Sequence, residues 1–258
     1  DKMPGSPIGY WVSKEILNTF SQKPISSVAK TRVGCQTSDN NRFLRLWHEV
    51  SARRSKYDSS AKEEAESSTF KWFPYNKGGE YRKWYGNNEF LVNWYGGGAD
   101  IHKNSNLPLD YAGAPVRAKH FYFRPSITFS KIATDGFSSR LSNGGFVFDT
   151  GGPSIFTNLD LAVLQGFLSS NLCKKFLSVL SPTINFSVGD IKRLPIDLNA
   201  FSRVEFNSGR ALEIYKADWD SSELSWEFLE NPLIKKRSEE ENLSSAFESY
   251  KKHCNNLV

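Results

Sequence analysis

The sequence predicts an α+β fold, in which a strand-rich first part, residues 1–157, precedes a mainly helical part, residues 158–258, and both are compatible with one continuous domain. Short segments rich in aromatic and β-branched residues fill residues 69–149 between glycine-containing turns, which is typical of strands. Leucines at helical spacing follow after residue 158. Residues 71–145 carry 10 Lys and Arg against 5 Asp and Glu, whereas residues 200–258 carry 8 against 11, so positive charge is concentrated in the first part.

The first part is expected to open with a short helix between Ile8 and Phe20. In residues 41–50, NRFLRLWHEV, an imperfect alternation predicts a strand that buries Phe43, Leu46 and Trp47. The polar, serine-rich residues 51–68 are typical of a mobile loop or an insertion. Further strands are expected in FKWFPY (70–75), EFLVNWY (89–95), HFYFRP (120–125), ITFSKIA (127–133) and GFVFD (145–149).

The second part is expected to contain three amphipathic helices, in residues 158–180, 200–217 and 238–253. Asn158 is the predicted N-cap of the first, which carries leucines at helical spacing, namely Leu161, Leu164, Leu168 and Leu172. In the third, Ser238 and Glu241 have the spacing of a capping box. One face of that helix is predicted to hold Leu243, Phe247 and Tyr250.

Composition limits the class of protein. The three cysteines, Cys35, Cys173 and Cys254, are too few and too far apart for a disulfide framework or a metal knuckle, which favours a reducing cytoplasm. No apolar run reaches the ~18 residues that a membrane-spanning helix needs, so no membrane partner is expected. No secretion signal follows Asp1, and we expect the chain to be a fragment of a larger protein.

Catalytic motifs are missing from the sequence. It contains no nucleotide-binding, zinc-protease or serine-hydrolase motif. The cluster of Asp218, Asp220 and Glu223 is better explained as solvated charge at a helix end than as a metal site. The (N/D)PP(Y/F) tetrapeptide of amino-directed DNA methyltransferases and a glycine-rich loop for S-adenosylmethionine are absent as well. We therefore expect no catalytic residue, metal or cofactor in this chain, and no activity from the chain alone.

The most informative segment for binding is residues 71–95, KWFPYNKGGEYRKWYGNNEFLVNWY, where cations and aromatic rings are interleaved. Cations neutralise phosphates, rings stack on bases, and glycines such as Gly78 let the backbone approach an anion. Composition alone is equally compatible with a loop whose rings pack inward. Arg124 precedes Pro125 after an aromatic segment, and Arg140 lies in GFSSRLSNGGF, which predicts a flexible turn; each can instead be an internal ion-pair partner.

Seven segments follow a known pattern: PIGYWVS (7–13), T-x-D-N-x-R-F-L-R-x-W-x-E-V (37–50), KWFPYNKGGEYRKWYGN (71–87), GFSSR (136–140), GFVFD (145–149), LSPTINFSVGDIKRLPI (180–196) and DWDSSELSWEF (218–228). On these segments the chain resembles the region that follows the catalytic domain in large adenine-specific DNA methyltransferases of the BREX phage-exclusion type. Those enzymes are similar to single-chain type II restriction-modification enzymes.

The resemblance implies a target-recognition region that grips double-stranded DNA. A Rossmann-like domain of the same polypeptide would bind S-adenosylmethionine and methylate a flipped adenine at N6. The element from Thr37 to Asn40 would mark the beginning of the recognition region. Ser38 stands where the family usually has glycine, which argues against a turn that requires a positive φ there. Residues 169–171, Ser-Ser-Asn, match the family's LNSK-type segment only loosely.

We expect the DNA-binding surface to lie in residues 71–145. The residues predicted to hold phosphates are Lys71, Lys77, Lys83 and Arg117. Those predicted to enter a groove, because a guanidinium group fits guanine O6 and N7, are Arg82, Arg124 and Arg140. Arg42 is one further predicted DNA contact.

Two alternatives remain open from the sequence. The chain can be a protein-interaction module that binds other subunits of a defence complex through exposed aromatic residues and its acidic last part. It can also be an autonomous nuclease, since Asp190-Ile191-Lys192 has the D-x-K form of a nuclease motif. The nuclease alternative lacks an upstream acidic partner on a neighbouring predicted strand.

Overall fold

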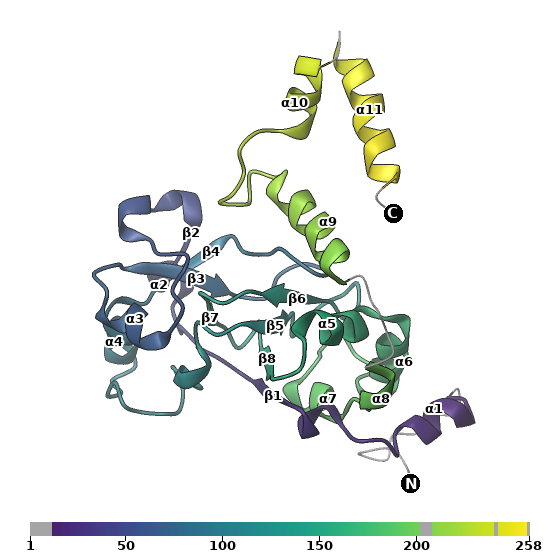
Figure 1. Cartoon of the computed structure of the whole chain (residues 1–258). Coiled ribbons are helices and arrows are strands. Elements are labelled where there is room, and N and C mark those ends of the chain that lie inside the picture. Colours follow the sequence, from purple (N-terminus) through teal and green to yellow (C-terminus); the bar gives the residue numbers. More distant parts are fainter. Residues whose placement is uncertain (1–11, 202–207, 240–241, 257–258) are drawn as a thin grey trace.

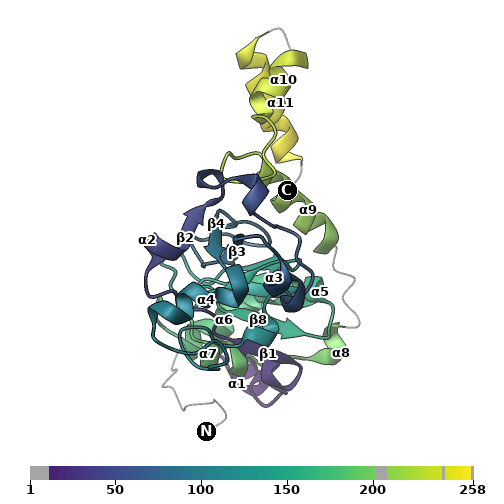
Figure 2. The ribbon, with the colours of Figure 1, turned by 90° about the vertical axis from the view of Figure 1, so that its left-hand side faces the viewer.

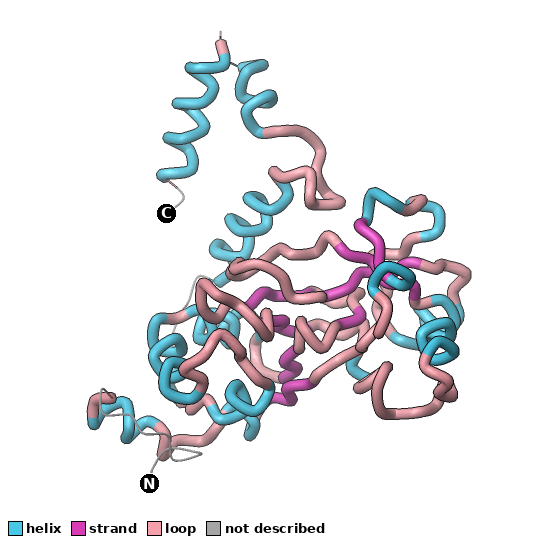
Figure 3. The backbone as a smooth tube through the Cα atoms, turned by 180° about the vertical axis from the view of Figure 1, so that it is seen from behind, coloured by secondary structure: helices cyan, strands magenta, loops and turns pink. Residues whose placement is uncertain are grey.

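A computed structural model describes residues 12–201, 208–239 and 242–256, and it has the mixed α+β architecture that the sequence predicts (Figure 1). Strands form two four-stranded sheets in the first part, and helices dominate the second. The strands cross the middle of the body, and most helices lie at its periphery (Figure 3). The chain enters through α1 (Lys14–Thr19), which begins within the predicted first helix, and the preceding residues 8–11 lie outside the described residues.

Sheet 1 is antiparallel throughout and has the strand order β1 (Ala29–Arg32), β8 (Ser154–Thr157), β5 (Ser126–Phe129) and β6 (Ser139–Ser142). Along β1, Ala29 and Thr31 are buried, whereas Lys30 and Arg32 face outward, as the two-residue period of a strand requires. The sequence analysis missed β1, β6 and β8, because four-residue segments such as AKTR and SRLS are mainly polar and carry little strand propensity.

Sheet 2 has the strand order β2 (Leu44–Leu46), β4 (Phe90–Asn93), β3 (Trp72–Asn76) and β7 (Val147–Phe148). β3 pairs antiparallel with β4 and parallel with β7. The predicted strands in FKWFPY, EFLVNWY, ITFSKIA and GFVFD are therefore present, although shortened. HFYFRP is not a strand: it contains the 3-10 helix η4 (Lys119–Phe121), and Phe123 has a φ of 65°.

Sheet 1 separates two hydrophobic cores. Consecutive residues of β8 point to opposite faces, so Ile155 packs in a core with helices α5 and α6, whereas Phe156 joins an aromatic core around sheet 2. Phe156 lies 4.7 Å from Phe121 and 5.5 Å from Phe148, measured between ring centroids. The same face of the sheet is left uncovered at its β1 edge, where Lys30 is exposed opposite Phe156.

The segment 41–50 does not form the single strand predicted. α2 (Asn40–Phe43) and the 3-10 helix η2 (Trp47–Glu49) leave only β2 extended. Capping is the reason: the Asp39 carboxylate accepts a hydrogen bond from the Arg42 backbone nitrogen at 3.0 Å, and Glu49 accepts one from the Leu46 nitrogen at 2.7 Å. Phe43 is buried as predicted, but Leu46 and Trp47 are only half-buried.

The prediction of a loop over residues 51–68 is wrong. The segment contains the 3-10 helix η3 (Ala52–Arg54) and α3 (Lys62–Ser67), which packs on α4 (Tyr95–Asn104). Ala65 is fully buried, and Lys56 forms an ion pair with Glu64 at 2.8 Å. Sequence reasoning missed this helix because one buried alanine among charged residues gives almost no periodic signal. One of the glycine-containing turns predicted between the strands, at Gly96–Gly98, is a left-handed stretch inside α4.

The predicted helix over residues 158–180 is two helices, α5 (Leu161–Ser169) and α6 (Asn171–Leu180). Ser170 is extended, and its hydroxyl accepts a hydrogen bond from the Cys173 nitrogen at 3.1 Å, so it ends one helix and caps the next. Asp160, rather than Asn158, caps α5. The next helix, α7 (Val188–Arg193), packs against the 3-10 helix η1 (Ile25–Ser27), which lies near the start of the chain. It is followed by α8 (Leu198–Phe201) and α9 (Ser208–Asp220).

The last two helices, α10 (Pro232–Glu239) and α11 (Leu243–Asn255), form a hairpin that stands away from the body (Figures 1 and 2). The predicted cap of this region is wrong, because Ser238 lies inside α10 and Asn242 caps α11 by accepting from the Ser245 nitrogen at 3.0 Å. Glu241 lies outside the described residues. No helix in the described ranges is both long and apolar enough to cross a membrane.

Candidate nucleic-acid interface

Arg140 is not on the surface. It lies in β6 opposite Thr128 and is 1% exposed, so the prediction of a flexible turn is wrong. Its guanidinium group donates to the Ser130 hydroxyl at 3.2 Å and to the Arg82 carbonyl oxygen at 3.4 Å. Burial lowers the pKa of Arg140 to about 10. A side chain enclosed in this way does not reach a DNA groove, and Arg140 is not part of the interface that we propose.

Arg82 and Lys83 attach the helical part to the strand-rich part. Arg82 forms an ion pair with Asp218 of α9, and its guanidinium carbon lies 4.9 Å from the ring centroid of Trp219. Lys83 donates to the carbonyl oxygen of Ser169, at the end of α5, at 3.0 Å. The cations of residues 81–85 therefore have internal partners. For this part of the segment 71–95, inward packing is a better interpretation than an exposed DNA-binding surface.

Three predicted contacts have no carboxylate partner among the described residues: Lys71, Arg117 and Arg42. Lys71 lies 5.3 Å from the Trp72 ring, Arg117 is half-buried, and Arg42 donates to the side chain of Asn104 at 2.8 Å. Arg124 is exposed and lies in a separate hollow, described below.

Lys77 lies where three adjoining hollows meet, with volumes of about 410, 330 and 390 Å³. We call their union the Lys77 groove, and define it by Thr37, Ser38, Asn40, Arg45, Lys77, Gly79, Lys131, Thr150 and Gly151. These residues come from four separate stretches of the chain: residues 37–45, the turn after β3, the residue Lys131 after β5, and the turn before β8. Of the predicted phosphate contacts, Lys77 is therefore the one that occupies the centre of a concave surface.

Close packing of two glycine turns creates this groove. Gly78, with a φ of 91°, has no room for a side chain, because a Cβ there would lie 2.6 Å from the Gly151 carbonyl oxygen. A Cβ on Gly152 would likewise lie 2.5 Å from the carbonyl oxygen of Asn76. The turn after β3 and the turn before β8 therefore touch through their backbones, which places Lys77 beside Thr150.

The T-x-D-N element forms one wall of the groove and is a capping structure. The Thr37 hydroxyl donates to the Asn40 side-chain oxygen at 2.6 Å, and Asp39 caps α2. Ser38 has a φ of 60°, so the turn with positive φ is present although serine replaces the usual glycine, which corrects the sequence-based expectation. A positive φ is strained for a residue with a Cβ, and the side chain of Ser38 is exposed.

We expect Ser38→Gly to raise the free energy of unfolding by about 0.5–1 kcal/mol. Glycine removes the cost of the left-handed backbone, which is about 1–2 kcal/mol for an ordinary residue. Part of this gain is lost, because glycine gives the unfolded chain more conformational entropy. Urea unfolding followed by circular dichroism measures this change. Ser38→Ala, which keeps a Cβ, is the control and should bring no gain; a Gly variant no more stable than the Ala variant would contradict the argument.

The cations of the groove form no close ion pair within the ranges that the structure describes. In the described part of the chain, Lys77, Lys131 and Arg45 form no ion pair with a carboxylate. Two carboxylates also line the groove, Asp149 and Glu49, and the charge of nearby Lys77 opposes the rise that burial causes in the pKa of Glu89. Asp149 accepts hydrogen bonds from the Thr150 hydroxyl and the Gly151 nitrogen at 2.8 and 3.1 Å, and Glu49 caps η2. These cations can therefore pair with an anion from outside.

Sequence reasoning missed Lys131 and Lys30 as candidates. Lys131 belongs to the predicted ITFSKIA strand but follows β5, and its backbone nitrogen donates to the Gly151 carbonyl oxygen at 2.9 Å. The alternation of A-K-T-R at residues 29–32 was the available signal for Lys30 and Arg32, since it sends both basic side chains to one face.

The D-x-K segment has a structural role. Ser187 is the N-cap of α7, and Asp190 completes its capping box by accepting from the Ser187 nitrogen at 3.0 Å; Asp190 also forms an ion pair with Arg193 at 2.6 Å. In the acidic cluster, Asp218 pairs with Arg82 and Asp220 pairs with Lys216. No group of three or more potential metal ligands was found when the described residues were searched. The geometry therefore favours neither a nuclease centre at Asp190 nor a metal site at Asp218.

Comparison with known proteins gives two long matches. The adenine-specific methyltransferase PglX of Lacticaseibacillus casei (strain Zhang) is 36% identical over 265 residues, which covers 98% of this chain and 22% of that protein. The adenine-specific methyltransferase BrxX of Escherichia coli O9:H4 (strain HS) is 35% identical over 259 residues, covering 98% and 20%. The chain thus spans about a fifth of the length of these relatives. No protein-family model matches it.

Among solved structures, the type IIL restriction-modification enzyme MmeI in complex with DNA aligns with a TM-score of 0.46 and 13% sequence identity, covering 92% of this chain and 33% of that one. A similarity of this size supports no functional conclusion. The two long matches confirm the resemblance to large adenine-specific methyltransferases that the seven sequence segments indicated. Over nearly its full length, the chain is homologous to one region, about a fifth, of the adenine-specific methyltransferases PglX and BrxX.

Proposed function

We propose that this chain is the DNA sequence-recognition region of an adenine-specific DNA methyltransferase that acts at N6 in a restriction-modification or phage-defence system, and that catalysis takes place outside it. The observation that carries this proposal is the Lys77 groove, in which cations without carboxylate partners line a concave surface. Double-stranded DNA is the polyanion that an adenine-specific methyltransferase must hold.

The groove offers two kinds of contact. Lys77 and Lys131 would hold phosphates, because an ammonium group on a flexible stem neutralises charge without reading sequence. Asn40 is a candidate for base reading: its side-chain oxygen accepts from Thr37, and in the described residues its amide nitrogen donates to no partner. Asparagine can pair with adenine at N6 and N7. Lys71, Arg117 and Arg42 are additional phosphate contacts in this proposal.

The described residues do not form the kind of site that binds S-adenosylmethionine in a Rossmann-like domain. The Rossmann-like domain that the resemblance implies requires a parallel sheet with a glycine-rich turn after its first strand. Among the strands that the structure describes, only β3 and β7 are parallel, and they share two residue pairs. We therefore assign the cofactor and methyl transfer to the catalytic part of the longer polypeptide, and derive no chemical step from the residues present here.

Binding of the 258-residue chain to a pool of duplexes with a randomised core tests the recognition role. We expect the bound duplexes to share a sequence motif, and the logarithm of the affinity to fall with the logarithm of salt concentration by about 0.9 for each phosphate contacted. If the bound duplexes share no motif, the chain binds DNA without recognising a sequence. Binding that is absent, or that is indifferent to salt, contradicts the proposal.

A second role, protein interaction, is favoured by the α10–α11 hairpin. It stands off the body (Figure 2), and large apolar side chains of this region are exposed, Leu229 at 93% and Phe247 at 49%. We propose that the hairpin contacts the catalytic part of the parent polypeptide or another defence subunit. Phe247→Ser should then weaken association with the remainder of the parent polypeptide, supplied as a separate chain, while leaving duplex binding unchanged.

A further inference from the structure

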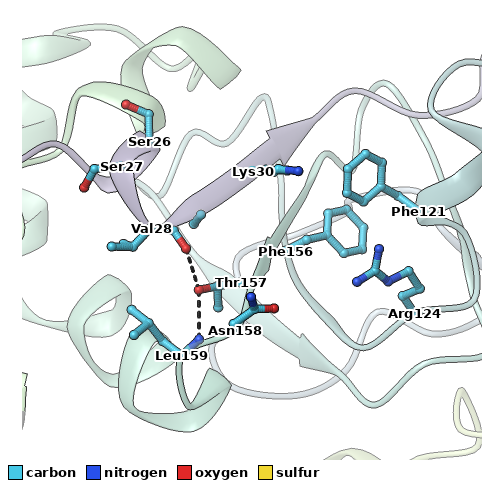
Figure 4. A pocket seen from close by; sticks show the side chains of 11 residues that line it. Ser26, Ser27, Val28, Lys30, Phe121, Arg124, Phe156, Thr157, Asn158 and Leu159 are labelled. Atoms are coloured by element: carbon cyan, nitrogen blue, oxygen red, sulfur yellow. Dashed lines mark hydrogen bonds between the residues drawn. The ribbon is translucent and has the colours of Figure 1, made fainter.

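A second hollow, with a volume of about 450 Å³, lies at the start of β1 and the end of β8. We call it the Lys30 pocket and define it by Ser26, Lys30, Phe121, Arg124, Thr157 and Asn158 (Figure 4). It forms where the outer face of sheet 1 is not covered by the aromatic core. The pocket and the Lys77 groove are joined by one stretch of chain, because residues 26–30 line the former and residues 36–40 line the latter.

Two cations line this pocket, Lys30 and Arg124, and a third, Arg32, contacts the Phe121 ring that forms part of its wall. The alternation of β1 turns Lys30 and Arg32 to the same outward face. The guanidinium carbons of Arg32 and Arg124 lie 5.1 and 5.7 Å from the centroid of the same Phe121 ring, so one ring orders both groups. None of the three cations forms an ion pair with a carboxylate in the part of the chain that the structure describes. Like charges held together without a counter-ion indicate a site for an external anion.

The walls of the pocket are fixed, and neutral groups face it. Thr157 donates its hydroxyl to the Val28 carbonyl oxygen at 2.8 Å and accepts from the Leu159 nitrogen at 3.1 Å, which ties η1 to the turn before α5 (Figure 4). Ser26 and Asn158 are exposed, and among the described residues their side chains have no hydrogen-bond partner. The pocket therefore combines charged and neutral donors on a rigid frame, which is the donor set that a phosphate oxygen requires.

We propose that the Lys30 pocket holds a backbone phosphate of the same duplex that occupies the Lys77 groove. This inference rests on the proposed function. Lys30 and Thr37 are seven residues apart, so an extended chain separates them by at most about 25 Å, less than the rise of one duplex turn, about 34 Å. Two anchors at that separation fix the register of the protein along the duplex. Arg124, predicted from the sequence to enter a groove, holds a phosphate instead.

Ethylation interference tests the proposal at each phosphate of the duplex in turn. Ethylation removes the charge of a single phosphate, so a position that matters blocks binding. We expect the wild-type 258-residue chain to show two separate groups of blocking phosphates. The double variant Lys30→Ala with Arg124→Ala should lose one group, bind about tenfold more weakly, and show a salt slope shallower by about 1. Its selected sequence motif should be unchanged, because phosphate contacts carry no sequence information.

A double variant of two exposed lysines outside both hollows, Lys175→Ala with Lys251→Ala, is the matched control for loss of charge. It should keep both groups of blocking phosphates. If the Lys30 and Arg124 variant also keeps both groups, or if its motif changes, the inference is overturned while the proposed function stands on the Lys77 groove. If the wild-type chain binds no duplex, the proposed function and this inference fail together. Thermal unfolding checks that each variant is folded.

Discussion

Replacing Lys77 by glutamate is expected to weaken binding of duplex DNA by about 30-fold to 100-fold at moderate salt, the largest loss among single changes to a surface cation of this chain. Lys77 is shared by all three hollows of the groove, and its ammonium group lies 4.6 Å from the Phe90 ring without a carboxylate partner among the described residues. Reversal of its charge removes a phosphate contact and adds repulsion at the centre of the concave surface.

Lys77→Ala separates the two effects. It removes the phosphate contact without adding repulsion, so about tenfold weaker binding is expected, alike for every DNA sequence. Fluorescence anisotropy with a labelled duplex at several salt concentrations measures both variants. Lys175→Ala, an exposed cation on α6, is the control and should bind like the wild type. Equal binding by the wild type and Lys77→Glu at low salt would show that DNA does not occupy this groove.

Gly34→Ala is expected to cost about 3 kcal/mol or more of folding free energy, the largest loss of stability that we predict. A Cβ at Gly34 would lie 1.9 Å from the carbonyl oxygen of Phe148 in β7 and 2.5 Å from its ring. The neighbouring Cys35 nitrogen donates to that same oxygen at 2.7 Å, and the Cys35 oxygen accepts from the Thr150 nitrogen at 3.1 Å. These bonds join the segment after β1 to β7 and hence sheet 1 to sheet 2.

The overlap is with backbone, so it cannot be relieved by turning a flexible side chain. Thermal unfolding of Gly34→Ala should show a Tm lower by about 6–12 °C, since each kcal/mol corresponds to about 2–4 °C for a chain of this size. Gly209→Ala in α9 is the matched control, because a Cβ there meets nothing within 4 Å and alanine favours a helix. A Gly34→Ala protein that melts with the wild type would refute this view of how the sheets are joined.

Local patterns predicted elements whose signal is contained in their own residues. The aromatic segments at 70–75 and 89–95 contain β3 and β4, and the leucine-rich segment after residue 158 is helical. Caps were harder to predict. Ser170 divides one predicted helix into α5 and α6, and Asp39 turns a predicted strand into α2, because a single side chain that accepts from a backbone nitrogen can outweigh the propensity of several residues.

The roles of the arginines depended on distant partners. Arg82, predicted to read bases, instead pairs with Asp218, which lies 136 residues further along the chain. Arg140 is enclosed because β6 pairs with β5, and no feature of GFSSRLSNGGF indicates that pairing. Lys77 lies in a groove because two glycine turns, at residues 78–79 and 151–152, touch through their backbones. Each of these outcomes joins residues that are far apart in the sequence.

The sequence by itself determined the α+β class, the concentration of positive charge in the first part and the kinship with adenine-specific methyltransferases, because each is a property of residue types and their local order. Only the tertiary structure decided which cations are free. A charged side chain is available to DNA only if folding leaves it exposed and brings no carboxylate into an ion pair with it, and such carboxylates come from strands and helices elsewhere in the chain.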